Sequence, residues 1–476
     1  MRRRRRRGSL SLGFVGRGRD RVVSSLLKRI APPGDSPECL PRFVPGSWAY
    51  VILSWLGSLC GFNPTQVDSV LQDGAGRRAL WNLLRSISDY GVHTPQTLSA
   101  PVSVVWSLSY GCNLRCMHCY QNASRPSPDE LTLDQQLSVV DQMARAGVSM
   151  VVLSGGEPLT NPNLGKLIER IRAYEMAISI DSNGVLMDRS VVESLRRAGV
   201  ASVELSLDSV NARSHDQFRG LEGAFEKTID AVEICSEAGM FTTVATTATT
   251  LNCADSRELI SLARSHGANR VVFFDLIPAG RGRDIEGLRL SRHQLLDLMA
   301  LVKEESSRNG VEVFTELPQF VVYSSNERGN SLPNRADQAV SVERFTVSTF
   351  FDCAGRDNVY RRYAPYLGGC PAGRFYCNIQ PNGDVTPCMF MPEYPVAGNL
   401  KMQSFEEIWV SRTFQALRDR ALLKGKCREC RFAIVCGGCR AKAAAYEGDY
   451  LASDPTCPIH NGSAQLHSRE AVASTL

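Results

Sequence analysis

The feature that most constrains this chain is a group of three closely spaced cysteines directly after an apolar run. Residues 102–108 are mostly apolar, and Cys112, Cys116 and Cys119 follow them with the spacing C-x3-C-x2-C. Among biological metal sites, soft thiolate ligands favour iron-sulfur clusters or zinc. Three thiolates hold only three irons of a four-iron cluster, whereas a fourth protein ligand closes a structural zinc site. The motif therefore predicts an iron-sulfur cluster with one open iron, where a small molecule binds.

From residue 101 onward, apolar strand-length segments alternate with helix-length segments. The expected strands are residues 102–108, 150–153, 177–180, 202–207, 241–247 and 270–276, and the first expected helices are 133–146 and 164–174. Repeated βα units form a parallel sheet covered by helices, with right-handed connections. The sequence therefore predicts an α/β fold with an open or partial barrel of six βα units.

Polar motifs follow the expected strands at their carboxyl ends, where ligands bind in parallel α/β folds. They are the three cysteines, then Gly155, Gly156, Glu157 and Pro158, then Asn183, and finally Ser206 and Asp208. The two glycines let the backbone approach a ligand closely, and Glu157 with neighbouring carbonyls can accept hydrogen bonds from an ammonium group. Each motif also has an ordinary explanation, because Asn183-Gly184 suits a turn and Asp208 suits a helix cap. Arg219 suits either a ligand carboxylate or a structural ion pair.

Together these motifs resemble the radical S-adenosylmethionine (SAM) superfamily, whose open iron binds the methionine part of SAM. The resemblance implies that Gly155, Gly156, Glu157 and Pro158 hold the SAM amino group, while Asn183, Ser206 and Asp208 bind its ribose or carboxylate. His118 takes a position where the family often has an aromatic ring near the adenine. The implied reaction is reductive SAM cleavage to a 5'-deoxyadenosyl radical that abstracts a substrate hydrogen. No catalytic residue beyond the cluster ligands is expected.

A second group of cysteines lies near the C-terminus, as two close pairs and one later residue. These are Cys427, Cys430, Cys436, Cys439 and Cys457. Upstream, Cys370 and Cys388 bracket an expected hairpin, since Asn382-Gly383 is typical of a tight turn between two strands. The spacing suits a buried metal site, and by itself it leaves both iron-sulfur clusters and a zinc ribbon open.

This block resembles the SPASM extension of radical SAM enzymes, which carries one or two auxiliary four-iron clusters. The resemblance covers about residues 101 to 460. It implies one cluster held by Cys427, Cys430, Cys436 and Cys457, and another held by Cys370, Cys388 and Cys439 with Cys377 as the fourth ligand. It also implies an external electron donor such as ferredoxin or flavodoxin.

Residues 273–282, 370–374 and 439–443 resemble segments of the radical SAM enzymes of alternative haem and haem d1 synthesis. Those enzymes remodel carboxylate side chains of a tetrapyrrole, so Arg281, Arg283, Arg374 and Arg440 are candidates for pairing with acetate or propionate groups. One alternative is a peptide-modifying maturase, although residues 37–100 lack the β-rich pattern of a leader-peptide domain. Another is a non-catalytic iron-sulfur carrier, which would not need the motif at Gly155.

Composition indicates an ordinary globular chain of 476 residues that is 43% hydrophobic and 22% charged. The net charge of +5 comes mainly from the arginines at 2–7, which favour a solvated tail over nucleic-acid binding. No signal peptide is apparent, and the apolar segment 50–62 is too short to span a bilayer, so we expect a cytoplasmic protein without a membrane partner. The expected regions are a basic arm (1–36), a helical region (37–100), the core (101–320), a linker (321–365), the cysteine-rich domain (366–460) and a tail (461–476).

Overall fold

The computed structural model describes residues 64–91, 95–306, 308, 310–320, 323 and 369–458. The predicted basic arm 1–36, the apolar segment 50–62 and the tail 461–476 lie outside these residues. The predicted linker 321–365 also lies outside them, apart from Tyr323.

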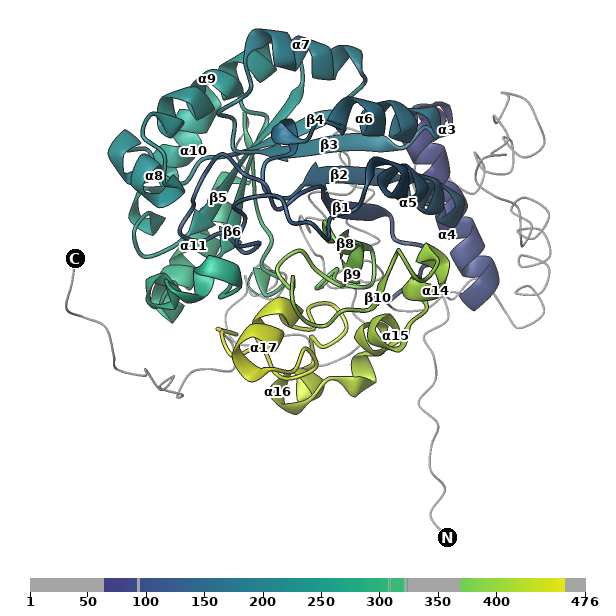
Figure 1. Ribbon diagram of the computed structural model, residues 1–476. Coiled ribbons are helices and arrows are strands. Elements are labelled where there is room, and N and C mark those ends of the chain that lie inside the picture. The colour runs from purple at the N-terminus through teal and green to yellow at the C-terminus, as the bar shows by residue number, and fades with distance from the viewer. Residues whose placement is uncertain are drawn as a thin grey trace.

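A continuous ten-stranded sheet forms the centre of the molecule, in the order β10-β9-β8-β1-β2-β3-β4-β5-β6-β7 (Figure 1). The strands are β1 (Ser103–Ser107), β2 (Met150–Ser154), β3 (Ala177–Ser182), β4 (Ser202–Ser206), β5 (Phe241–Ala248), β6 (Arg270–Asp275), β7 (Glu312–Thr315), β8 (Tyr376–Ile379), β9 (Asp384–Thr386) and β10 (Gly398–Asn399). Strands β1 to β7 pair in parallel with their sequence neighbours. The six predicted strands and the α/β barrel are therefore confirmed.

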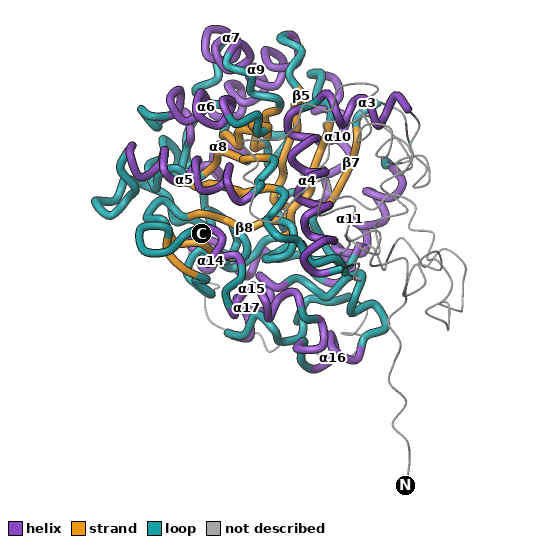
Figure 2. Tube along the Cα trace, turned by 90° about the vertical axis from the view of Figure 1, so that its right-hand side faces the viewer, coloured by secondary structure: helices purple, strands orange, loops and turns teal. Residues whose placement is uncertain are grey.

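Helices follow the strands along the chain and cover the outer face of the curved sheet (Figure 2). They are α5 (Leu133–Ala146), α6 (Leu164–Ala173), α7 (Arg189–Arg197), α8 (Ala212–Arg219), α9 (Ala224–Glu237), α10 (Ser256–Ser265) and α11 (Arg292–Glu305). Helix α5 has the predicted limits, because Thr132 and Gln135 form a capping box at its start and Gly147, at φ 101°, ends it.

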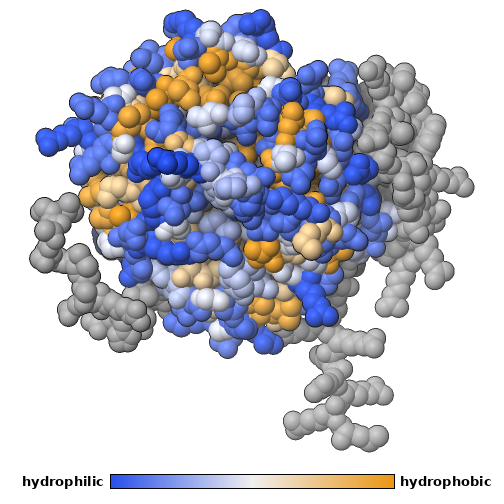
Figure 3. Space-filling model, in the orientation of Figure 1, coloured by the Kyte–Doolittle hydropathy of each residue, from blue (hydrophilic) through white to orange (hydrophobic). Residues whose placement is uncertain are grey.

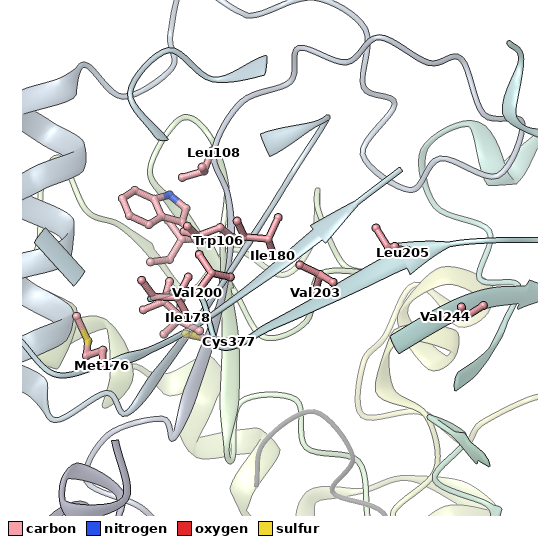
Figure 4. Close-up of a cluster of buried hydrophobic side chains, with 14 of the residues drawn as sticks. Trp106, Leu108, Met176, Ile178, Ile180, Val200, Val203, Leu205, Val244 and Cys377 are labelled. Atoms are coloured by element: carbon pink, nitrogen blue, oxygen red, sulfur yellow. The ribbon is translucent and has the colours of Figure 1, made fainter. Parts of the chain in front are cut away.

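The two faces of the barrel strands carry different side chains. Ile178, Ile180, Val203 and Leu205 belong to the main hydrophobic core (Figure 4), while Glu204 faces the barrel interior. This alternation follows from the period of two residues in a strand. The helices thus bury the apolar face, and the opposite face is left to line an interior space.

Four strands of the sheet, β7 to β10, were not predicted as part of the barrel. Strand β7 adds to β6, and β8 pairs in parallel with β1, with Ser103 opposite Tyr376. The predicted hairpin is confirmed by the antiparallel pairing of β8 with β9 and by Gly383 at φ 91° in the turn. What the sequence did not indicate is that this hairpin extends the barrel sheet, because pairing between distant segments leaves no local pattern.

The N-terminal described segment is helical, as predicted, with α3 (Pro64–Gln72) and α4 (Gly74–Tyr90), and Gly91 ends α4 at φ 76°. The buried Arg78 fixes α4 to the barrel by donating to the carbonyls of Val148, at 2.7 Å, and Tyr174, at 3.2 Å. These hydrogen bonds satisfy donors of the buried guanidinium, which offsets part of the cost of burying it.

Short helices surround the second group of cysteines. They are α14 (Phe405–Trp409), α15 (Arg412–Arg418), α16 (Gly425–Glu429) and α17 (Arg440–Glu447). Hydrophilic side chains dominate the visible surface, with an apolar area at the top of the view, where α7 and α9 lie (Figure 3). In the described part of the chain, no helix is long and apolar enough to cross a membrane.

Candidate active site

The loop after β1 holds the first three cysteines, and its neighbours fix its path. Backbone hydrogen bonds join Arg115 to Arg219, at 3.2 Å, and Met117 to Phe218, at 2.9 Å. Arg281 donates to the carbonyls of Cys116, at 2.8 Å, and Ala123, at 2.9 Å. Arg281 therefore supports the cysteine loop, instead of taking the role in substrate recognition that the sequence suggested.

The glycine pair after β2 packs directly against the cysteine loop. Gly156 donates to the carbonyl of Ser109, at 2.8 Å, and Glu157 donates to the carbonyl of Gly111, at 2.9 Å. A Cβ on Gly156 would collide with that Gly111 carbonyl oxygen, and Gly155 has φ 126°. Only glycine fits these two positions, because one lacks space and the other has a backbone conformation that side chains disfavour.

The carboxylate of Glu157 braces the turn after β3. It accepts hydrogen bonds from the Ser182 hydroxyl and from the Asn183 backbone, both at 2.9 Å. Burial raises the pKa of Glu157 to about 7, against hydrogen bonds that lower it. The Glu157 side chain therefore holds Asn183 in place. The backbone of Gly155 and Gly156, and not Glu157, faces the small cavity beside the cysteine loop.

A cavity of about 150 Å³ opens between the cysteine loop and the strand ends. The predicted residues that line it are Cys112, Cys116, Cys119, His118, Gly155, Gly156, Asn183 and Ser206. Glu157, Pro158 and Asp208 do not line it. Burial raises the pKa of the Cys112 thiol to about 11, so this thiol needs a metal to become a thiolate at neutral pH. A cluster bound by three thiolates, with a small molecule beside it, fits this arrangement.

His118 forms one wall of that cavity as a flat, neutral ring. It stacks on Phe218 with ring centres 4.4 Å apart and planes at 9°. Burial lowers the pKa of His118 to about 3, so the ring carries no charge at neutral pH. Its buried Nδ1 has no hydrogen-bond partner among the described residues, which suits a site completed by a ligand.

Asp208 and Arg219 form a buried ion pair at 2.6 Å, in which Arg219 lines the cavity and Asp208 does not. Burial alone would raise the pKa of Asp208, but Arg219 and several smaller contributions, including the hydrogen bond from Thr247, together lower that pKa below its usual value. Asp208 also accepts a hydrogen bond from the backbone of Thr247 at 2.8 Å. Arg219 contacts Asp208 through Nη2, and its other terminal nitrogen, Nη1, lies 3.8 Å from the Cys116 sulfur. Of the two readings that the sequence left open for Arg219, the structure supports the ion pair and adds a contact with a cluster cysteine.

Three cysteines of the second group gather above the barrel interior. Cys370, Cys388 and Cys439 all line a second cavity, larger than the first, inside the barrel. They pack with Val105 and other residues of the inner barrel wall. The hydroxyl of Tyr376 donates to the Cys388 sulfur at 2.6 Å. Burial raises the pKa of the Cys388 thiol to about 12, so this group too needs a metal to ionise.

Cys377 is a correction to the predicted ligand set. Because side chains alternate along β8, Tyr376 faces the barrel interior and Cys377 faces the opposite side. Cys377 is fully buried and belongs to the main hydrophobic core (Figure 4), where it lies opposite Val104 of β1. The prediction that Cys377 is the fourth cluster ligand was therefore wrong, because spacing does not show which face of a strand a cysteine occupies.

Buried arginines surround the remaining cysteines, Cys427, Cys430, Cys436 and Cys457. Arg440 lies with Nη2 3.6 Å from the Cys427 sulfur and donates to the carbonyl of Ala452 at 2.7 Å. Arg420 donates to the carbonyl of Cys370 at 3.3 Å. Across the described residues, no three His, Cys, Asp or Glu side chains converge closely enough to bind a single metal ion.

The larger cavity, of about 410 Å³, occupies the barrel interior. Apolar side chains form much of its wall, including Val152, Phe241 and Phe274. It shares Phe274 and Phe390 with the smaller cavity, so the two spaces adjoin. A volume of this size lies within the range of small-molecule sites.

Both cations that line this interior are held in ion pairs, and the lining also carries the acidic residues Asp73, Asp181, Glu204 and Glu316. Arg270 pairs with Glu312 at 2.7 Å, and Lys442 forms an ion pair with Asp275. Burial raises the pKa of Asp181 to about 7. Burial, with the nearby Asp181, raises the pKa of Glu204 well above its usual value. These two carboxyl groups can therefore carry protons at neutral pH and act as hydrogen-bond donors.

None of the arginines proposed from sequence as substrate contacts lines the larger cavity. Arg283 is exposed and pairs with Glu393 at 2.6 Å, while Arg374 is buried with its guanidinium 4.7 Å from the Phe375 ring centre. The cations that do line it are Arg270 and Lys442. Sequence reasoning missed both, because only the curvature of the sheet and the packing of α17 bring them to this space.

Comparisons with known proteins agree with this geometry. The profile of the radical SAM superfamily matches residues 106–263, and that of an iron-sulfur cluster-binding domain, SPASM, matches residues 370–431. The AdoMet-dependent heme synthase of Methanosarcina barkeri is 31% identical over 76% of this chain and 98% of its own length. The pre-heme d1 synthase of Dinoroseobacter shibae is 32% identical over 74% of this chain and 85% of its own length.

Solved structures share the fold. The SuiB protein of Streptococcus suis bound to its precursor peptide SuiA has a TM-score of 0.60 at 18% identity, over 83% of this chain and 81% of that one. The AdoMet-bound anSMEcpe has a TM-score of 0.55 at 18% identity, over 75% of this chain and 94% of that one. The chain therefore belongs to the radical SAM superfamily, as an enzyme that uses a four-iron cluster and SAM and carries a SPASM auxiliary iron-sulfur domain.

Proposed function

We propose that this enzyme abstracts hydrogen from a carboxylate side chain of a tetrapyrrole, and that the side chain is then shortened or removed. The observation that carries the proposal is the apolar cavity of about 410 Å³ directly beside the SAM cavity. Its aromatic wall suits the face of a macrocycle. Similarity to a heme synthase and a pre-heme d1 synthase supports the same substrate class.

In this proposal Cys112, Cys116 and Cys119 hold the four-iron cluster, and the backbone of Gly155 and Gly156 receives the amino group of SAM. Asn183 and Ser206 bind the rest of its polar part, while His118 lies against the adenine. When bound, the cluster and SAM supply the radical that abstracts the substrate hydrogen. Cys370, Cys388 and Cys439 hold one auxiliary cluster, and Cys427, Cys430, Cys436 and Cys457 hold another. An external one-electron donor, such as ferredoxin or flavodoxin, reduces the enzyme.

The chain itself positions the substrate and excludes water. Phe274 and Phe390 belong to both cavities, so a substrate against these rings lies next to the SAM site. Phe390 also packs edge-on to Tyr120 of the cysteine loop, with ring centres 5.1 Å apart. An apolar boundary of this kind protects a reactive intermediate from solvent.

The experiment is anaerobic incubation of the cluster-loaded enzyme with SAM, a one-electron reductant and iron-coproporphyrin III. We expect 5'-deoxyadenosine, carbon dioxide and a porphyrin in which a propionate has become a vinyl group, detected by mass spectrometry; an auxiliary cluster would accept the electron released with the carbon dioxide. Relatives also include mycofactocin maturases at 29% identity, so a peptide substrate is the alternative outcome. Deoxyadenosine formation that depends on a peptide and is unaffected by the porphyrin would overturn the proposal.

A further inference from the structure

A small side pocket of about 90 Å³ lies at the seam between the barrel and the cysteine-rich domain. It adjoins the larger cavity, because Lys442 and Asp275 line both. One wall comes from the chain after β6 and the start of α11, and the other comes from α17 and the segment that ends at Cys457. The pocket is therefore a recess reached from the proposed substrate site.

The charge of this recess is positive. Arg289, Arg292 and Lys442 line it, against the single carboxylate of Asp275. Lys442 already forms an ion pair with Asp275, and Arg289 lies 3.7 Å from Glu286, which is half-exposed and outside the recess lining, so Arg292 supplies most of the excess charge. Arg289 is 29% exposed and lies with its guanidinium 5.8 Å from the Tyr446 ring centre. The recess thus favours an anion.

Its donors are suited to a carboxylate. Lys442 is 1% exposed and gives hydrogen bonds to Asp275 and to the Thr456 hydroxyl, the latter at 2.9 Å. An ammonium group has three protons, so one remains for a further acceptor. Arg292 uses Nε to donate to the carbonyl of Pro458 at 2.9 Å, and a guanidinium has four other N–H groups.

Leu276, Leu290 and Leu295 form an aliphatic part of the wall, and the rest comes from Tyr446, Pro455, Thr456 and Cys457. At about 30 Å³ per water molecule in the liquid, the recess has room for about three water-sized groups, the scale of the end of a short carboxylic acid side chain. Aliphatic walls with cations at one end match methylene groups that end in a carboxylate.

We propose that this recess binds a carboxylate group of the substrate, one that is not the site of hydrogen abstraction, through Arg289, Arg292 and Lys442. The proposal rests on the proposed function, because it assumes a substrate with several carboxylates. In this proposal, the residues of the recess take the role that the sequence had suggested for Arg281, Arg283, Arg374 and Arg440. The recess would set the orientation of a macrocycle and so decide which side chain reaches the SAM cavity.

The test measures binding of coproporphyrin and of its tetramethyl ester to the intact, cluster-loaded enzyme, by absorbance titration. The variants are the double substitution Arg289→Gln with Arg292→Gln, and the control Arg283→Gln, which removes an arginine of the same segment that faces Glu393. Iron per chain and SAM cleavage without substrate report whether a variant has kept its clusters and fold.

We expect wild type and the Arg283 variant to bind the free acid about tenfold more tightly than the ester, or more, as charge-assisted hydrogen bonds imply. The double variant should lose this preference and keep its ester affinity, and Arg289→Lys with Arg292→Lys should restore part of it. Equal affinity of wild type and the double variant for the free acid would overturn the proposal that the recess binds a carboxylate, while leaving the tetrapyrrole proposal intact. A wild-type enzyme that cleaves SAM but binds neither porphyrin would overturn both.

Discussion

The two groups of cysteines in this enzyme are built in different ways. Cys112, Cys116 and Cys119 lie in one loop, fixed by backbone hydrogen bonds and by Arg281. The cysteines of the second group come from residues 370–457, and a strand, several turns and α17 bring them together. A cluster site made from one loop can be recognised from spacing alone, whereas a site assembled from distant segments depends on which way each side chain faces.

Electrostatics extends this difference. In the first group the cation beside the sulfur, Arg219, is shared with Asp208, so its charge is largely neutralised locally. In the second group Arg440 donates to backbone carbonyls and lies near Cys427, and neutral carbonyls leave its full charge beside the sulfurs. Anionic clusters would compensate that charge.

The largest expected effect separates the two groups outright. Cys116→Ala removes a ligand of the first site, so we expect no 5'-deoxyadenosine and a loss of about four irons per chain, with the auxiliary iron retained. Iron analysis and mass spectrometry of the reaction check this. Cys235→Ala is the matched control, because Cys235 is buried in α9 within the hydrophobic core. Full SAM cleavage by the Cys116 variant would contradict the assignment of Cys116 as a ligand of the first cluster.

A comparison within the second group is sharper. Cys388→Ala should lose auxiliary iron, whereas Cys377→Ala should keep it and lower the free energy of unfolding by about 1 kcal/mol, the scale of a small core truncation. Iron per chain and chemical denaturation measure the two effects. Iron loss in the Cys377 variant, with its fold intact, would return that residue to the ligand set.

Two glycines test whether the first loop depends on close backbone packing. Gly156→Ala places a methyl group against the Gly111 carbonyl, so we expect SAM affinity to fall at least about tenfold. Gly165→Ala is the control, since nothing lies within 4 Å of its Cβ position. In α6 that change should stabilise the fold by about 0.5–1 kcal/mol. Equal SAM binding by both variants, measured by equilibrium dialysis, would contradict the packing argument.

The smallest effect concerns the interior between the two groups. The pKa of Asp181 is about 7 in the fold, above its ordinary value of 3.8. Between those values the folded enzyme keeps a proton that the unfolded chain releases, so this group makes stability fall as pH rises toward 7. The slope approaches about 1.4 kcal/mol per pH unit. Asp181→Asn should flatten the slope, measured by urea unfolding from about pH 5.5 to 7. A slope identical to wild type would contradict the raised pKa.

How far sequence reasoning reached follows the same division. Local patterns predicted the strands, helix α5 and the hairpin turn at Gly383. They also predicted the residues from Cys112 to Ser206 that share the smaller cavity. Local patterns could not show that the Glu157 side chain turns toward Ser182, or that Arg440 donates its hydrogen bonds to backbone carbonyls. They also could not reveal Arg270 or Lys442 in the interior, because packing between distant elements decides which side chains reach it.

The pairing of β8 with β1 has a mechanical consequence. Ser103 to Trp106 run beside Tyr376 to Ile379, and the backbone of Val102 donates to the carbonyl of Phe375 at 2.7 Å. Swinging the cysteine-rich domain away from the barrel would break this ladder at about 1 kcal/mol net per hydrogen bond, besides exposing the apolar contacts around Val105. In the described part of the chain, the cysteine-rich domain is therefore tied to the barrel as an extension of the same sheet.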